Sequence, residues 1–360
     1  MKKLIKACQI MKIDKIKVSI IIPVYNVAPY VKRCLDSVFA QTYKNIEILI
    51  IDDCGTDNSI EIVKDLTLKE KIENDIRIIH HPHNKGLSVA RNTGIKESTG
   101  DYLYFLDSDD EITPECIELL LNETSTQTPD FVIADYNCIG NNVPMPPLSI
   151  NRKTISGSSE ILKLFREQKW YVMAVNKLIR KSFIISNELF FKENIIHEDI
   201  LWSFLLACNA TVIKVIKDKT YNYYIREDSI TESIKVQNNN QFKHRSNESK
   251  RVIVSSMYTY LIESEQKDKN KDINKTFEEY KYLLFISIIK NNTYTKDELF
   301  FIYKEFGRLK NTTNLRIFLL NCVDIKTFIK FFHYLLPSYF GYRYIIGLEK
   351  LNKKRNTIFK

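Results

Sequence analysis

Uninterrupted apolar runs of strand length recur through the first third of the chain. Such runs are typical of strands buried on both faces of a parallel sheet, because an exposed face would show polar residues at alternate positions. Between these runs, apolar residues recur at helical spacing. The alternation predicts a parallel α/β sheet with intervening helices. The expected strands are Val18 to Asn26, stopped by Pro23, then Asn45 to Asp53, Ile76 to His80 and Tyr102 to Leu106, and the expected helices are Tyr30 to Phe39, Ile60 to Leu66 and one from Leu87 onward.

The remainder of the chain is less regular. A further strand is expected from Phe131 to Tyr136, and the segment from Trp170 to Lys181 continues the same domain. Beyond about Lys235 the sequence is rich in asparagine and then shows apolar residues at helical spacing. For a chain of 360 residues we therefore expect a basic lead over 1–17, a large α/β domain over 18–232 and a mainly helical region over 233–360.

Carboxylates stand at the ends of two of the expected strands. Asp53 ends one strand, and Asp107, Asp109 and Asp110 follow another. Ligands of open α/β sheets bind at the carboxyl ends of the strands. Clustered carboxylates repel one another unless a cation holds them, and hard oxygen ligands suit Mg²⁺ or Mn²⁺. The alternative is helix capping by Asp110 or Thr113 ahead of Pro114, but capping explains one such strand end more readily than two.

The first strand adds Pro23, Tyr25 and Asn26 to the same edge, where a ring can stack on a base and an amide can hydrogen-bond to it. In this arrangement Asp53 faces a ribose or base, while Asp107 and Asp109 face a metal that carries phosphates. Two basic residues after the third strand, Lys85 and Arg91, are candidates for phosphate contacts. For Lys85 the alternative is a position in a solvated loop. Arg91 lies early in a helix, where the helix dipole does not favour a cation, so a phosphate partner is the preferred interpretation.

Composition narrows the class of protein. An apolar fraction of 44% and a charged fraction of 27% are ordinary for a globular chain and argue against a polytopic membrane protein. Much of the net charge of +9 lies near the two ends, which indicates an anionic surface, lipid or nucleic acid. Seven scattered cysteines without a CxxC pair, and an apolar start interrupted by lysines, favour a reduced, cytoplasmic compartment without a signal or membrane span.

The runs IIPVYN, IIDDCGTDNS, NKGLSVARNTG and YLYFLDSDD, in this order and spacing, resemble the nucleotide-binding half of the family 2 glycosyltransferases of the GT-A fold, over roughly Lys17 to Ile230. The resemblance implies that Asp53 contacts uracil or ribose, that Tyr25 borders the base, and that Asp109, last in the DxD motif begun by Asp107, binds Mn²⁺ or Mg²⁺. Where the family usually reads DDGSTD, this chain has Cys54 and Gly55, with both aspartates retained.

The segment ENIIHEDILWSFLLA predicts a helix that begins near His197. In the resembling family the matching ED pair is Glu198 and Asp199, with Asp199 as general base, and the helix dipole is expected to keep that carboxylate ionised at neutral pH. The alternative is that both acids only complement the helix N-terminus. His197 has two alternative interpretations, a structural or acid-pairing role and metal ligation. Arg226 and Ser229, in YNYYIREDSIT, are further candidates to reach the diphosphate.

The final stretch, FIKFFHYLLPSYFGYRYIIGLEKLNKKR, mixes aromatic residues with a basic end. It fits a peripheral segment at the inner face of an anionic membrane, or a packed helical hairpin split at Pro337. The resemblance implies an inverting enzyme that moves a sugar from a nucleotide-diphosphate donor, with uridine expected, to a hydroxyl of a glycan or lipid-linked glycan in cell-surface polysaccharide synthesis. An inactive sugar-nucleotide or glycan-binding scaffold is the alternative.

Two other functions are disfavoured by the sequence. Nucleotidyl transfer would call for a glycine-rich phosphate loop after the first strand, and PVYNVAPY has no glycine. Nucleic-acid binding would rest on the basic ends alone, so no nucleic-acid partner is expected.

Overall fold

The computed structural model describes residues 15–69, 75–125, 127–140, 148–225, 240–263, 271–310, 312–322 and 324–358. The chain forms two compact units, Met1–Val236 and Gln237–Lys360. The second, Gln237–Lys360, is called the helical unit. Much of the basic lead, including Lys2, Lys3, Lys6 and Lys12, lies outside the described residues.

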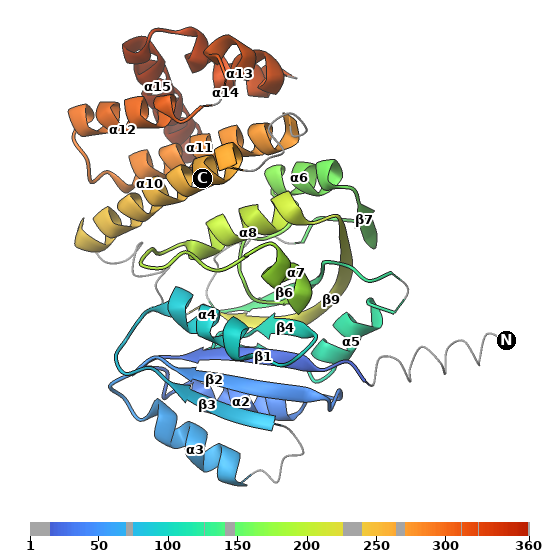
Figure 1. Ribbon diagram of the computed structural model, residues 1–360. Coiled ribbons are helices and arrows are strands. Elements are labelled where there is room, and N and C mark those ends of the chain that lie inside the picture. The colour runs from blue at the N-terminus through green and yellow to red at the C-terminus, as the bar shows by residue number, and fades with distance from the viewer. Residues whose placement is uncertain are drawn as a thin grey trace, which may run out of the picture. The chain divides into compact units, whose positions relative to one another are not determined.

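The first unit is built on the parallel strands that the apolar runs predict. β1 (Val18–Val24), β2 (Ile46–Asp52), β3 (Asp75–His80) and β4 (Tyr102–Phe105) lie in the order β3-β2-β1-β4 (Figure 1). The intervening helices are α2 (Val31–Phe39), α3 (Ser59–Lys69) and α4 (Leu87–Glu97). Helix α4 packs on β1 and β2 so closely that a Cβ on Gly94 would meet Ile21 at 2.2 Å. The α/β prediction is confirmed for this half of the sheet.

One boundary was predicted wrongly. Strand β1 does not stop at Pro23 but continues to Val24, and Pro23 lies in register with Ile51 of β2. Proline lacks the N–H group that a central strand must donate. Residues two apart in a strand face the same neighbouring strand, so Pro23 faces the same side as Ile21. The carbonyl of Ile21 accepts a hydrogen bond from the N–H of Leu106, just after the end of β4 at Phe105. Pro23 therefore faces the side of β1 where β4 has already ended, and no described strand there needs its missing N–H.

Beyond β4 the sheet becomes mixed. Strand β8 (Lys177–Arg180) is antiparallel to both β4 and β6 (Phe131–Ile139), and β9 (Val212–Tyr224) runs parallel to β6. The short strands β5 (Glu111–Ile112) and β7 (Thr154–Ser156) pair antiparallel with β9. The helices of this half are α5 (Cys116–Asn122), α6 (Ser158–Arg166), α7 (Lys181–Ser186) and α8 (Glu198–Asn209). Within the described part of this unit the result is a nine-stranded sheet flanked by helices.

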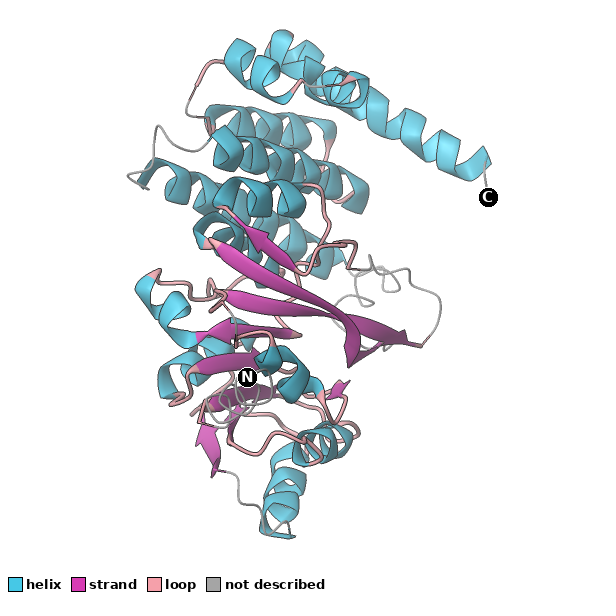
Figure 2. Ribbon diagram, turned by 90° about the vertical axis from the view of Figure 1, so that its right-hand side faces the viewer, coloured by secondary structure: helices cyan, strands magenta, loops and turns pink. Residues whose placement is uncertain are grey.

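The helical unit contains α10 (Asn240–Glu263), α11 (Lys271–Asn291), α12 (Lys296–Arg308), α13 (Asn314–Asn321), α14 (Ile325–Phe331), the 3₁₀ turn η1 (Phe332–Leu335) and α15 (Ser338–Ile358). Figure 2 shows the described strands in the first unit and the described elements of the helical unit as helices. Capping boxes mark the N-termini of two of these helices. Thr295 and Glu298 form a reciprocal capping box at α12, and Asp324 and Thr327 form one at α14.

The aromatic tail breaks at Pro337, between η1 and α15, as the hairpin interpretation requires. Phe331 is buried, and it forms a small core with Ile317, Phe318 and Tyr334. Phe328 and Phe340 remain exposed, at 44% and 61%. No helix among the described residues is long and apolar enough to cross a membrane.

Candidate active site

The side chain of Asn26 links the loops that follow β1 and β2. The backbone of Asn26 lies in the left-handed region, with φ 51°. Its Oδ1 accepts hydrogen bonds from the backbone N–H groups of Thr56, at 2.7 Å, and Asp57, at 3.3 Å. Tyr25, the preceding residue, is 46% exposed. Asn26 therefore shapes the loop after β2, while the ring of Tyr25 is free to stack on a ligand.

Asp53 lies at the end of β2, where the sequence places it, but its carboxylate is buried and engaged by protein groups. Its Oδ1 accepts from the backbone of Lys85, its Oδ2 accepts from the backbone of Gly86, both at 2.8 Å, and the Nδ1 of His81 lies 2.7 Å from Oδ1. The role that this geometry supports is positioning of the 81–86 loop. Direct contact with a ribose or base stays a prediction.

The carboxylates after β4 do not all face the same way. Asp110 is buried and turned toward β9, where it accepts from the Tyr221 hydroxyl at 2.7 Å and from the Tyr224 backbone at 2.8 Å. Burial, reinforced by the charges of Asp109 and Asp107, raises its pKa well above the usual value. Asp107 and Asp109 remain partly exposed. Asp110 therefore ties the loop to β9, whereas the carboxylates of Asp107 and Asp109 lie at the partly exposed face of the loop.

Arg33 on α2 clamps this loop from the other side. Its guanidinium donates to the backbone carbonyl of Asp109 and lies over the ring of Tyr224, 3.5 Å from the centroid. Its Nε is 3.8 Å from Oε2 of Glu111. The DxD loop is thus held between α2 and β9, an arrangement that the sequence analysis did not foresee.

Arg91 on α4 joins the two acidic segments of the site. Its side chain is 4% exposed; Nη1 lies 2.7 Å from Oε1 of Glu198 and Nη2 lies 2.9 Å from Oδ1 of Asp107. The ring of Phe191 packs against the same guanidinium. In this geometry Arg91 is a link between β4 and the start of α8, and its charge is already balanced by carboxylates.

Asp199 opens α8 directly after Glu198, and its electrostatics differ from the prediction. Burial and the neighbouring Glu198 charge raise its pKa to about 7, although Arg91, the Ile200 backbone and Lys177 oppose the shift. The expectation that the helix dipole keeps this group ionised at neutral pH was wrong, because here desolvation and the charge of Glu198 outweigh the dipole. A carboxyl with a pKa near the operating pH is suited to general base catalysis.

Lys177 is a site neighbour that the sequence analysis missed. It is fully buried on β8, its Nζ donates to the Met173 carbonyl and lies 4.3 Å from the centroid of the Tyr171 ring. Burial lowers its pKa well below the usual value, while the charge of Asp199 raises it. The segment NKLIRK contains it, but a lysine within an apolar segment gives no sign that its amine lies near an acid.

The residues that could hold a divalent cation are Asp107 and Asp109. Among the described residues no group of three or more histidine, cysteine or acidic side chains is placed to hold a metal ion. Mg²⁺ at phosphate-binding sites uses one or two protein carboxylates and completes its shell with phosphates and water, so two partly exposed aspartates fit that chemistry. His197 is the residue before α8, with φ 63°, and belongs to no such group. Arg226 and Ser229 lie outside the described residues.

The sequence of this chain is similar to those of known glycosyltransferases. Residues 19–186 match the model of glycosyl transferase family 2. An uncharacterized glycosyltransferase of Haemophilus influenzae is 33% identical over 196 residues, which cover 53% of this chain and 71% of that protein. The poly(ribitol-phosphate) beta-N-acetylglucosaminyltransferase TarP of Staphylococcus aureus is 30% identical over 213 residues, 58% of this chain and 62% of TarP. The chain therefore belongs to glycosyl transferase family 2.

The fold is also similar to that of a protein whose structure has been solved. The structure of S. aureus TarS residues 1–349 in complex with UDP-GlcNAc superposes with a TM-score of 0.66 at 19% identity, covering 88% of this chain and 90% of that one. At that identity the likeness establishes the GT-A fold, which confirms the predicted fold class. The chain spans 62–63% of the length of several curated relatives that it matches.

Proposed function

We propose that this protein transfers a sugar from a nucleotide-diphosphate sugar to a hydroxyl of a cell-surface polysaccharide, with inversion at the anomeric carbon. The observation that carries the proposal is the Arg91 bridge, which ties the DxD aspartate Asp107 to Glu198, the residue beside Asp199. A metal-side carboxylate and a candidate base are thereby held in one network. A glycan-binding scaffold would have no need for an acid whose pKa is raised to about 7.

A UDP-sugar is the proposed donor. The TarS structure contains UDP-GlcNAc, and the exposed ring of Tyr25 beside the Asn26 loop offers a stacking surface for a base. The acceptor class is proposed from TarP, whose name records action on poly(ribitol phosphate). A hydroxyl-rich polymer of this kind, or a lipid-linked glycan, supplies the attacking oxygen.

Asp107 and Asp109 would hold Mn²⁺ or Mg²⁺, which when bound supplies charge neutralisation for the departing diphosphate. The chain's own residues do the rest. Asp199 accepts the proton of the acceptor hydroxyl as its oxygen forms a bond to the anomeric carbon, and the bond from that carbon to the diphosphate breaks with its electron pair leaving on the nucleotide. Attack opposite the leaving group inverts the configuration without an enzymic nucleophile.

The test is donor specificity followed by product analysis. Purified protein is heated with UDP-GlcNAc, UDP-glucose or GDP-mannose, each with Mn²⁺, and a ligand at about 100 times its Kd should stabilise the fold by about 2.7 kcal/mol. The stabilising donor is then incubated with polyol-phosphate polymer, and the anomeric configuration is read by NMR. Retention of configuration, or donor binding without transfer or hydrolysis, would reject the proposal.

We further propose that the tail of the helical unit contacts the inner face of an anionic membrane. Tyr339 and Phe340, at the start of α15, are 53% and 61% exposed, and Arg343 lies near the Tyr339 ring. Aromatic side chains beside cations favour the headgroup region. Vesicle flotation with and without phosphatidylglycerol tests this, and equal flotation with neutral vesicles would contradict an anionic surface.

A further inference from the structure

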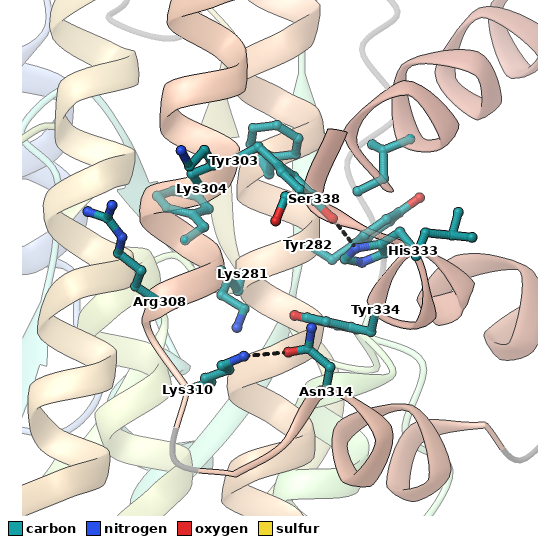
Figure 3. A pocket seen from close by; sticks show the side chains of 15 residues that line it. Lys281, Tyr282, Tyr303, Lys304, Arg308, Lys310, Asn314, His333, Tyr334 and Ser338 are labelled. Carbon is teal, nitrogen blue, oxygen red and sulfur yellow. Dashed lines mark hydrogen bonds between the residues drawn. The ribbon is translucent and has the colours of Figure 1, made fainter. Parts of the chain in front are cut away.

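The helical unit contains a cavity of about 290 Å³, a volume at the lower end for a small-molecule site (Figure 3). Residues from α11, α12, α13, η1 and α15 line it. The cavity uses none of the residues of the candidate active site.

The cavity wall is positively charged. Lys304 and Arg308 on α12 are exposed, and Lys310 follows them closely. Lys281, on α11, is buried and is neutralised by Glu278, whose Oε2 lies 2.8 Å from its Nζ. Within the described parts of the chain no carboxylate forms an ion pair with Lys304, Arg308 or Lys310. Three positive charges therefore remain to attract an anion, and phosphate is a group that lysine and arginine bind well.

The other walls are aromatic and polar. The rings of Tyr282, Tyr303 and Phe285 line the cavity together with the amide of Asn314. Aromatic rings pack on the apolar C–H groups of sugars and polyols, and hydroxyl and amide groups hydrogen-bond to their hydroxyls. Asn314 already accepts a hydrogen bond from Lys310 at 2.6 Å, which orients both side chains (Figure 3).

His333 adds a polar atom without a protein partner. It is 5% exposed, its Nδ1 lies 3.0 Å from the Tyr303 hydroxyl, and its buried Nε2 has no hydrogen-bond partner among the described residues. Burial and the charge of Lys281 lower its pKa to about 3, so the ring is neutral. If the Tyr303 hydroxyl donates to Nδ1, Nε2 carries the proton and is a donor that needs an acceptor.

Gly307 borders the cavity from within α12. A Cβ at this position would meet no atom within 4 Å, so packing does not require glycine here. Glycine inside a helix costs about 1 kcal/mol relative to alanine. Its presence leaves the space beside α12 open to a ligand.

From these observations we propose that the cavity binds a phosphate-bearing sugar or polyol. The phosphate would lie toward Lys304, Arg308 and Lys310, and the carbon chain would pack on the tyrosine rings. This inference goes beyond the proposed transfer reaction and does not depend on it. Phosphorylated polyols occur both as soluble or polymeric units and as lipid headgroups, so the experiment has an arm for each source.

The first arm is isothermal titration of the full chain with glycerol 3-phosphate, with glycerol and inorganic phosphate as comparison probes. Gly307→Met should fill the cavity and weaken binding of glycerol 3-phosphate at least tenfold, and its higher helix propensity should preserve folding. The matched control is Gly347→Met. Gly347 also lies in a helix, and a Cβ added there would meet no atom within 4 Å, but Gly347 does not line the cavity. Its affinity should stay within twofold of the wild type.

A second variant, Lys304→Gln with Arg308→Gln, should lose affinity for glycerol 3-phosphate and show a weaker dependence of binding on salt. The second arm is flotation with phosphatidylglycerol vesicles. Flotation lost in Gly307→Met assigns the ligand to a lipid headgroup, and flotation kept assigns it to a soluble or polymeric phosphate. Both outcomes support the proposal.

The proposal is overturned if wild-type protein binds glycerol 3-phosphate more weakly than about 1 mM, if inorganic phosphate binds equally well, or if Gly307→Met binds like the wild type. UDP-GlcNAc binding, measured on the same variants, should not change. Failure at the cavity and failure at the proposed active site are therefore distinguished by separate ligands.

Discussion

The guanidinium of Arg91 lies 2.7 Å from the carboxylate of Glu198, a residue 107 positions later in the chain. Arg91 belongs to α4 and Glu198 to the first turn of α8, and both side chains are largely buried. Because Arg91 also pairs with Asp107, one side chain fixes the distance between the DxD loop and the acidic helix start. The pair is the structural basis for placing Asp107, a proposed metal ligand, and Asp199, the proposed base, in one site.

We therefore predict that Arg91→Met destabilises the protein by about 3–5 kcal/mol, because it leaves the buried carboxylate of Glu198 without its cation. Chemical denaturation measures this change. The double variant Arg91→Met with Glu198→Gln should recover part of the loss, since no unpaired charge remains. A single variant that unfolds like the wild type would show that the bridge carries no stability.

Asp199→Asn should lower kcat by roughly 10²- to 10⁴-fold and leave donor KM nearly unchanged, because asparagine cannot accept the acceptor proton. In the wild type, kcat/KM should fall as the pH drops below about 7, since the raised pKa of Asp199 leaves less of the base form. Steady-state kinetics from pH 5.5 to 8.5 measure both. Normal kcat with impaired donor binding would assign Asp199 a structural role instead.

The same raised pKa predicts a stability effect with a definite sign. An aspartate with a pKa of about 3.9 in the unfolded chain and about 7 in the fold adds stability at low pH that is lost as the pH rises through 7. The melting temperature of Asp199→Asn relative to wild type should therefore be higher at pH 8 than at pH 5. A difference that does not vary with pH would show that Asp199 is not desolvated.

Asp109→Asn should weaken Mn²⁺-dependent donor binding, because one of the two partly exposed carboxylates after β4 is lost. Calorimetric titration with UDP-GlcNAc, with Mn²⁺ and with excess chelator, measures the change. The matched control is Asp75→Asn, an exposed aspartate at the other end of the parallel strands. Full activity of Asp109→Asn, or of wild type in chelator, would contradict a metal site.

Tyr339→Ser with Phe340→Ser should reduce flotation with phosphatidylglycerol vesicles severalfold and leave donor hydrolysis intact. The reason is the loss of two aromatic side chains from the headgroup region. Phe301→Ser is the matched control, because Phe301 is 61% exposed, like Phe340, but lies on α12. Equal loss in the control would assign the effect to general surface hydrophobicity.

The sequence by itself determined the parallel half of the fold and the positions of the acidic segments. Runs such as those of β1 and β2 are apolar throughout because both faces are covered, so local pattern alone marks them. The carboxyl ends of parallel strands share an edge, which brings Asp53 and Asp107 to one side of the sheet without knowledge of any contact.

Tertiary structure alone decided which carboxylates are open and how they are charged. Asp53 holds a loop, Asp110 faces Tyr221, and Asp199 has a raised pKa because of burial and Glu198. Strands β8 and β9 were not predicted, since Lys177 and Lys214 interrupt their apolar pattern. Both lysines are nevertheless buried, Lys177 beside the ring of Tyr171 and Lys214 with its Nζ donating to the distant carbonyl of Glu123. Desolvation and pairing depend on which residues meet across the fold, and no local pattern in the chain records those partners.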